Sequence, residues 1–202
     1  MNFNMTLPFS KKRPLSWSAI SSFHYNREEW FNRYILNQKQ QENTSMYAGK
    51  AIGNKIESDP TYLPEVPRLP VFEKKMLGVL DKVPLIGYLD TYCPDTHAFN
   101  EYKTSKNKDR WTHKTAHDHG QLDMYTFLIW LNTKTKPEDV KINLVYIPVE
   151  ETDDFSIVVS KEPIVILPVK KTMVDIIKFA SHIKHTYKAM GEYVVHRRET
   201  GA

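Results

Sequence analysis

Three charged side chains, Asp90, Glu101 and Lys103, stand among apolar and aromatic residues in the stretch GYLDTYCPDTHAFNEYKTS, residues 87–105. The stretch predicts two strands around a turn at residues 94–97. If the turn is symmetric, Asp90 lies directly opposite Glu101, and because side chains of a strand alternate between its faces, Lys103 shares their face. Two opposed carboxylates repel each other, and one lysine balances only one of them. The spacing therefore indicates a divalent cation between the two acids.

The ligand type indicates which cation this is. Carboxylate oxygens are the ligands that Mg²⁺ and Mn²⁺ prefer, and such sites use one or two acids together with substrate phosphate. The alternative is a solvated strand face with an incidental Glu-Lys pair, because an acid two residues before a lysine is a common pattern. Apolar and aromatic neighbours on both strands favour a buried face instead: Ile86, Leu89, Tyr92, Phe99 and Tyr102.

The elements that must position these charges follow from hydrophobic spacing. Helices are predicted from Ser16 to about residue 25, then over residues 27–35, 47–58, 112–131 and 170–190. Strands are predicted over residues 71–80, 84–93, 97–104, 141–149, 155–160 and 163–168. A polar loop is expected at 38–45, and prolines at 60, 64, 67 and 70 predict an extended connector, because proline fits neither a helix interior nor a central strand. This order predicts one mixed α/β domain over residues 1–202.

Composition narrows the class of protein. The chain is 41% hydrophobic and 26% charged, which is ordinary for a globular protein, and its net charge of +4 is compatible with an anionic partner without requiring one. The single cysteine, Cys93, excludes an intrachain disulfide and a cysteine-ligated iron–sulfur cluster. We see no apolar run long enough for a membrane span, so we expect a cytoplasmic protein without a membrane partner.

Several motifs in order resemble one family. The pattern G-Y-L-D, then E-Y-K, then Q-L-D-M-Y resembles the PD-(D/E)XK nuclease superfamily, and more closely its RecB-type branch, which includes phage recombination exonucleases. The opening LSWSAISSFHYNREEWFNRYI is similar to the N-terminal segment of that branch, and YAGKAIGNKIES is similar to its acid-bearing helix. The resemblance covers about residues 15–131. It implies a restriction-endonuclease-like core, a mixed central β-sheet flanked by helices.

The resemblance also implies a metal site. Asp90 and Glu101 would hold the ion, and the backbone carbonyl of Tyr102 would be a further ligand. Glu57 would reach a second Mg²⁺ or Mn²⁺ ion or its water, although a helix-surface acid is the alternative for this residue.

The remaining family motif supplies the other catalytic groups. Lys103 would contact the attacking water or the scissile phosphate, and a compact ammonium suits this role. Gln121 and Tyr125 are four residues apart and share a helix face, from which they would position Lys103, the water or the DNA backbone. The alternative is that both are ordinary residues of a half-buried helix.

A basic run follows Lys103. Lys106, Lys108 and Arg110 would suit a phosphate backbone beside a metal site, although such a run is usually a solvated loop. Trp111 either stacks on a base or fills the core. His117 shares the predicted stripe of the Q-x-x-x-Y motif, so we expect it to face the site. A zinc site is not supported by the three histidines at 113, 117 and 119, because no cysteine joins them and the H-E-x-x-H pattern is absent.

Two departures from the family pattern bear on function. Gly53 stands where the family usually has a histidine, and Tyr25 begins the place where iron–sulfur relatives often have a cysteine. A compact enzyme without an iron–sulfur cluster is therefore expected.

The main hypothesis is a Mg²⁺- or Mn²⁺-dependent DNA nuclease, an exonuclease of phage type acting in recombination or repair. DNA would be its partner, together with a single-strand annealing or recombination protein. The alternative is a nucleic-acid-binding module of the same fold whose catalysis is weak or lost, which Gly53 favours. A third hypothesis is a small α/β domain with chance motif matches.

Overall fold

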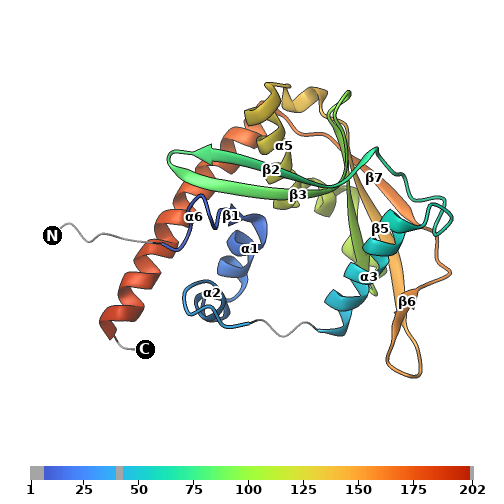
Figure 1. Cartoon of the computed structure of the whole chain (residues 1–202), viewed down its shortest axis with the longest axis horizontal. Coiled ribbons are helices and arrows are strands. Elements are labelled where there is room, and N and C mark those ends of the chain that lie inside the picture. Colours follow the sequence, from blue (N-terminus) through green and yellow to red (C-terminus); the bar gives the residue numbers. More distant parts are fainter. Residues whose placement is uncertain (1–6, 40–42, 201–202) are drawn as a thin grey trace.

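A computed structural model of the chain describes residues 7–39 and 43–200, and a single seven-stranded mixed sheet runs through it (Figure 1). The strands are β1 (Leu15–Ser16), β2 (Val71–Leu80), β3 (Val83–Cys93), β4 (Ala98–Ser105), β5 (Ile142–Glu151), β6 (Ile157–Val159) and β7 (Val165–Val169). The helices are α1 (Trp17–Tyr25), α2 (Arg27–Tyr34), α3 (Thr44–Ser58), α4 (His113–His117), α5 (Gly120–Thr133) and α6 (Met173–Thr200).

Strand β3 organises one half of the sheet and β5 the other. One edge of β3 pairs with β2 along nearly its whole length. The other edge pairs with β1 in parallel near the start of β3 and with β4 antiparallel at its end. Strand β4 then runs parallel to β5, which also carries β6 and β7. The sheet is therefore mixed, as the order of elements predicts.

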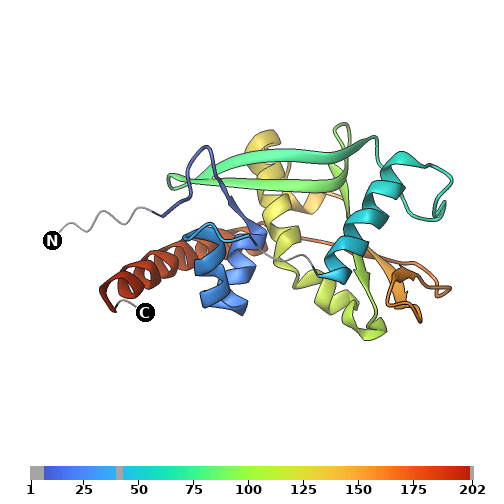
Figure 2. The same cartoon turned by 60° about the horizontal axis from the view of Figure 1, so that its bottom comes forward.

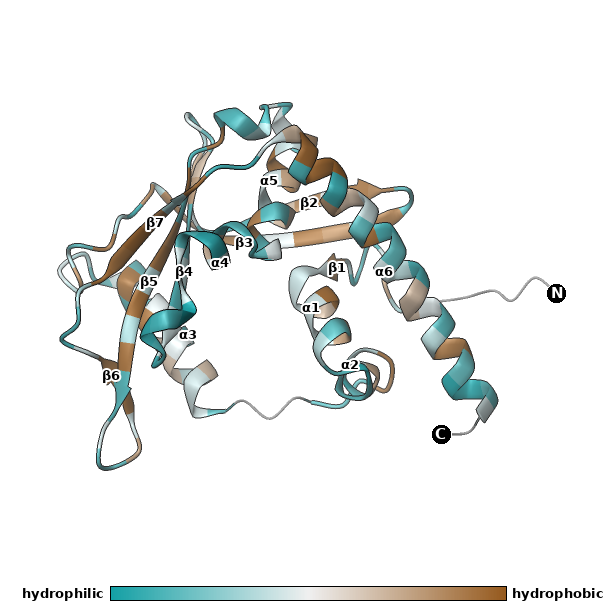
Figure 3. Ribbon diagram, turned by 180° about the vertical axis from the view of Figure 1, so that it is seen from behind, coloured by the Kyte–Doolittle hydropathy of each residue, from teal (hydrophilic) through white to brown (hydrophobic). Residues whose placement is uncertain are grey.

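Helices cover both faces of the sheet, and β5 is therefore buried on both sides. Leu144 and Tyr146 belong to the larger core, to which α1, α2, α5 and α6 contribute. Val145 and Ile147 belong to a smaller core with Ile52 of α3. A strand buried on two faces reads as a continuous apolar run, and β5 is largely hydrophobic in Figure 3. Figure 2 shows α3 lying apart from the bundle of α1, α2 and α6.

Polar side chains cap the first three helices, and Ser16 is the residue at which the sequence predicts the first one to start. Ser16 accepts a hydrogen bond from the Ala19 N–H, and Asn26 caps α2 through the N–H groups of Glu28 and Glu29. Asn43 caps α3, which starts at Thr44, a few residues before the predicted start. Of the loop expected at 38–45, residues 40–42 lie outside the described residues.

The helix predicted over residues 112–131 is in fact two helices, α4 and α5. In a continuous helix the His117 carbonyl would accept the N–H of Gln121, but here it accepts a hydrogen bond from Lys171. Gly120 also packs so tightly that a Cβ would lie 2.2 Å from the Trp17 ring. The break therefore coincides with contacts to two side chains distant in sequence, Lys171 and Trp17.

The last helix is longer than predicted, since α6 continues to Thr200 instead of ending near residue 190. Its C-terminal part is held by α2, because Val194 is buried and the Arg197 guanidinium lies 5.2 Å from the centre of the Phe31 ring. None of the helices in the described ranges combines the length and the apolar character that crossing a bilayer requires.

Candidate active site

The β3–β4 hairpin has the register expected from its symmetric turn, since Thr91 pairs with Asn100 and Cys93 with Ala98. Asp90 and Glu101 are the next positions in this register. The ladder ends before them, and the Asp90 carboxylate instead accepts a hydrogen bond of 2.6 Å from the backbone N–H of Tyr102. Asp90 and Glu101 are therefore not a ladder pair. A carboxylate takes the place of a backbone acceptor where the two strands part.

A third acid lies at the same level on the neighbouring strand. In the register of β2 and β3, Glu73 lies opposite Asp90. The pairing of the two strands is interrupted at this position. Glu73 has φ +46°, a left-handed conformation that is unusual for this residue type. Both ladders of β3 are thus broken at Asp90, and three carboxylates stand level on β2, β3 and β4. Sequence reasoning missed Glu73 because Glu73, Lys74 and Lys75 read as an ordinary strand surface.

Lys103 lies at the centre of the predicted catalytic group. Its Nζ donates to Glu101 Oε1 at 2.6 Å and to Gln121 Oε1 at 2.8 Å. The Gln121 Nε2 in turn donates to the Tyr125 hydroxyl at 2.6 Å. The structure therefore joins Glu101, Lys103, Gln121 and Tyr125 in one continuous network.

Glu101 is almost completely buried, with 2% of its surface exposed. Within residues 7–39 and 43–200, its Oε2 atom has no hydrogen-bond partner. A buried polar atom without a partner costs free energy, and a cation would remove that cost.

The charges at the site do not balance. Burial, and then the nearby Glu101, raise the pKa of Asp90 well above its ordinary value, against the opposing effect of Lys103. Burial also raises the pKa of Glu101, Lys103 opposes this, and Glu73 adds to it. Burial and Glu57 raise the pKa of Glu73. Burial is the larger cause of each shift, and repulsion from a neighbouring carboxylate adds to it, so a cation bound among these acids would relieve that repulsion.

Helix α3 brings Glu57 to the same place. Glu57, Glu73 and Asp90 line a small hollow of about 140 Å³, which Gly53 also lines. No atom lies within 4 Å of the position that a Gly53 Cβ would occupy, so the missing side chain leaves open space. The hollow therefore combines three acids with room beside them.

A second hollow of about 340 Å³ lies along α3 and β4. Lys50 and Gly53 line this hollow too, together with Lys103 and Thr104. Lys50 is exposed and lines both hollows, a position that the sequence did not reveal.

The carboxylates of the site are not arranged as a complete set of metal ligands. Among the residues that the structure describes, no three histidine, cysteine or acid side chains are grouped so that they could hold an ion. Lys103 contacts one oxygen of Glu101, and the Tyr102 N–H contacts one oxygen of Asp90. Each of these contacts uses one oxygen, so the second oxygen of each carboxylate is the one that would bind a metal ion.

The residues predicted to contact nucleic acid lie in different surroundings. Lys106 forms an ion pair with Glu151, and Lys108 forms one with Glu162, both at the surface. Exposed ion pairs are weak, so phosphate groups can replace these acids. The Arg110 guanidinium lies 5.8 Å from the Trp111 ring centre. Trp111 packs against the larger core, so its exposed face alone is free to stack.

His117 does not face the site as the sequence predicts, and His119 lies closer to it. Because the helix is broken, His117 leaves the stripe of Gln121 and instead contacts Asp118 at 3.2 Å. His119 lies edge-on to Trp111, and burial, and then the charge of Lys103, lower its pKa to about 3. The half-buried histidine near Lys103 is thus His119, in its neutral form, which sequence spacing did not indicate.

The chain resembles known proteins in structure and not in sequence. No family model matches it, and no curated protein matches its sequence. A candidate exonuclease of Eubacterium rectale superimposes with a TM-score of 0.60 at 11% identity, over 95% of this chain and 86% of that one. A phage-related exonuclease of Haemophilus somnus superimposes with a TM-score of 0.55 at 12% identity, over 95% of this chain and 91% of that one. The chain shares the fold of these exonucleases. The predicted fold class, a mixed sheet flanked by helices, is thereby confirmed.

Proposed function

We propose that this protein is a Mg²⁺- or Mn²⁺-dependent deoxyribonuclease of the PD-(D/E)XK type, in its RecB-like branch, which degrades DNA from its ends. The observation that carries the proposal is the network in which Lys103 contacts Glu101 and Gln121, beside Asp90 where both ladders break. The fold shared with two proteins described as exonucleases supports nuclease chemistry and the preference for ends.

The donor atoms fit a hard divalent cation. Asp90, Glu101 and the Tyr102 carbonyl would hold one ion, and Glu57 and Glu73 would reach a second ion or its water. All these donors are oxygens, and the unpartnered Oε2 of Glu101 is a ready ligand. When bound, such ions lower the pKa of water and stabilise the charge on the leaving oxygen.

The protein's own side chains orient the reactants. Gln121 holds the Lys103 ammonium in place, and Tyr125 fixes the amide of Gln121. An ammonium held in this way can contact the attacking water or a phosphate oxygen without further loss of side-chain entropy. Lys106, Lys108, Arg110 and the exposed face of Trp111 would contact the DNA strand beyond the scissile bond.

The biological setting of the proposal is recombination or repair of phage type. A single-strand annealing or recombination protein would act on the strand that the nuclease exposes. The resemblance of the motifs to phage recombination exonucleases supports this setting, as does the shared fold with a phage-related exonuclease.

The test is a cleavage assay on end-labelled linear DNA and on closed circular DNA, with Mg²⁺, Mn²⁺ or EDTA. We expect linear DNA to be degraded only with metal, and Lys103→Ala to lose at least about 100-fold in rate, as is typical for removal of a charge-stabilising group. Cleavage of circular DNA would contradict the end preference. Full activity of Lys103→Ala would contradict the site.

A second candidate function is supported by Gly53, whose missing side chain enlarges the hollow beside Glu57 and Asp90. In this case the protein binds DNA and does not cut it. Binding of linear DNA without cleavage in either metal would select this function.

A further inference from the structure

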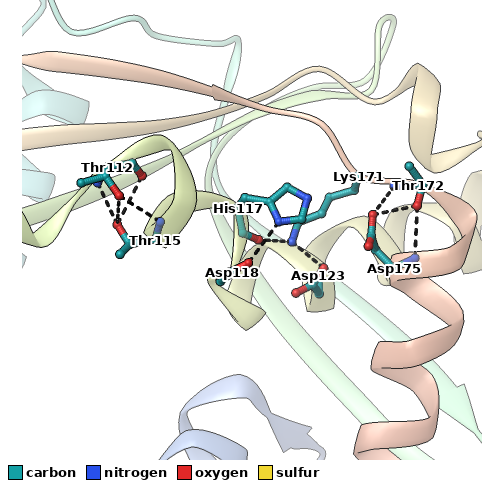
Figure 4. A network of polar contacts seen from close by, with 8 residues as sticks. All are labelled: Thr112, Thr115, His117, Asp118, Asp123, Lys171, Thr172 and Asp175. Atoms are coloured by element: carbon teal, nitrogen blue, oxygen red, sulfur yellow. Dashed lines mark hydrogen bonds and ion pairs between the residues drawn. The ribbon is translucent and has the colours of Figure 1, made fainter.

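One buried lysine holds the corner between α4 and α5. Lys171 follows β7, and only 2% of its surface is exposed. Its ammonium forms an ion pair of 2.6 Å with Asp123 of α5 and donates a hydrogen bond to the backbone carbonyl of His117 at the end of α4 (Figure 4). A single side chain therefore contacts both flanks of the corner.

This corner sets the position of Gln121 relative to Lys103. Gln121 lies in the first turn of α5, two residues before Asp123. Within the described chain, His119 provides no side-chain hydrogen bond to cap that turn, although Ser, Thr, Asp or Asn usually does so. The first turn of α5 is instead fixed by the Lys171 ion pair and by the Trp17 ring against Gly120.

The energetics of this pair favour a role in geometry. Burial raises the pKa of Asp123, which reports the cost of placing its charge away from water. A buried ion pair is often no more stabilising than an apolar pair of the same volume. What the pair does provide is a fixed distance and direction between β7 and the first turn of α5.

We propose that Lys171 and Asp123 are positioning residues, which hold the α4–α5 corner so that Gln121 stays within hydrogen-bond distance of Lys103. The inference rests on the proposed nuclease function. It assigns a part in DNA cleavage to two residues that touch neither the acids nor Lys103.

The first test compares Lys171→Met with Lys184→Met. Lys184 lies on α6 and forms an exposed ion pair with Asp81, so it is the matched control. We expect Lys171→Met to lower kcat by about 10- to 100-fold with little change in KM, because a small misplacement of a catalytic group has effects of that size. Lys171→Arg should recover most of the rate, and Lys184→Met should cleave like wild type.

A double-mutant cycle separates positioning from general loss of structure. If Lys171 acts through Gln121, then Lys171→Met should cost little further rate in a Gln121→Ala background. Equal losses in the two backgrounds would overturn the proposal. Asp123→Asn serves as a second variant should Lys171→Met not fold, and it is subject to the same criterion.

Hydrogen exchange provides a measurement that does not depend on cleavage. Lys171→Met should speed exchange of the backbone amides over residues 118–123, and Lys184→Met should leave it unchanged. Unchanged exchange in both variants would overturn the positioning role. If wild type cuts no DNA, the proposed function fails, while exchange still decides whether Lys171 holds the corner.

Discussion

Asp90 combines a structural and a chemical role in one side chain. Its carboxylate accepts the backbone N–H of Tyr102, so it completes the hydrogen bonding of β4 while it ends the ladder. Burial raises its pKa, so the folded protein holds the proton of this group more tightly than the unfolded chain does. Any substitution at Asp90 therefore has one effect through hydrogen bonding and another through charge.

The first prediction separates these effects with Asp90→Asn, which keeps an acceptor oxygen and cannot ionise. Because the folded pKa is raised, the stability contributed by Asp90 falls as pH rises from its unfolded pKa, about 3.9, toward the folded value. In EDTA, Asp90→Asn should therefore be more stable than wild type at neutral pH. The gain should vanish below about pH 3.9. Urea unfolding across pH measures it.

Asp90→Ala is the matched control for the hydrogen bond. It removes the same charge but leaves the Tyr102 N–H without its acceptor, at a cost of about 1–3 kcal/mol. It should be less stable than Asp90→Asn at every pH. A stability difference between Asp90→Asn and wild type that does not change with pH would contradict the assigned charge effect.

The second prediction concerns Gly53. No atom lies within 4 Å of its missing Cβ, so both Gly53→His and Gly53→Ala should be accommodated. Each should also stabilise α3 by up to about 1 kcal/mol, because glycine is a poor helix former. Only the histidine adds a nitrogen donor beside Glu57 and Asp90. Gly53→His should therefore lower the Mn²⁺ concentration needed for half-maximal cleavage, and Gly53→Ala should not.

At the scale of elements, α3 presents two lysines with different surroundings. Lys50 lines both hollows beside the site, while the Lys55 ammonium lies 4.2 Å from the ring centre of Tyr62. Lys50→Ala should weaken DNA binding about equally for all sequences and reduce the slope of log affinity against log salt by about 1. Lys55→Ala should leave the slope unchanged. Binding titrations at several salt concentrations, in EDTA to prevent cleavage, measure both.

A matching loss of slope in both variants would contradict a specific contact at Lys50. It would show that α3 contributes only general positive charge.

Elements built from local signals were predictable from the sequence. The β3–β4 hairpin register follows from a turn and an alternating pattern, and both are local. The break between α4 and α5 was not predictable, because it depends on Lys171, which lies 54 residues from His117. The approach of Glu73 to Asp90 was missed for a similar reason, since the broken ladder depends on three strands.

At the scale of the whole molecule, the order of helices and strands along the chain predicted the fold class. That order predicts a mixed α/β fold, and the mixed sheet of the structure and the two exonuclease folds confirm it. The length of α6 could not be predicted, because its polar C-terminal sequence is held by contacts with α2. Burial of a helix end depends on a partner surface, which a single sequence does not display.

The junction between the two halves of the sheet, where β3 pairs with β4, lies beside the row of acids. Only three residue pairs join β3 to β4 in the described ladder, against seven between β4 and β5. A hinge motion of one half of the sheet against the other would therefore open or close the distance between Asp90 and Glu101 first. An ion bound by both carboxylates would link the two halves of the sheet across this hinge. Binding of the ion would then also restrict motion of one half against the other.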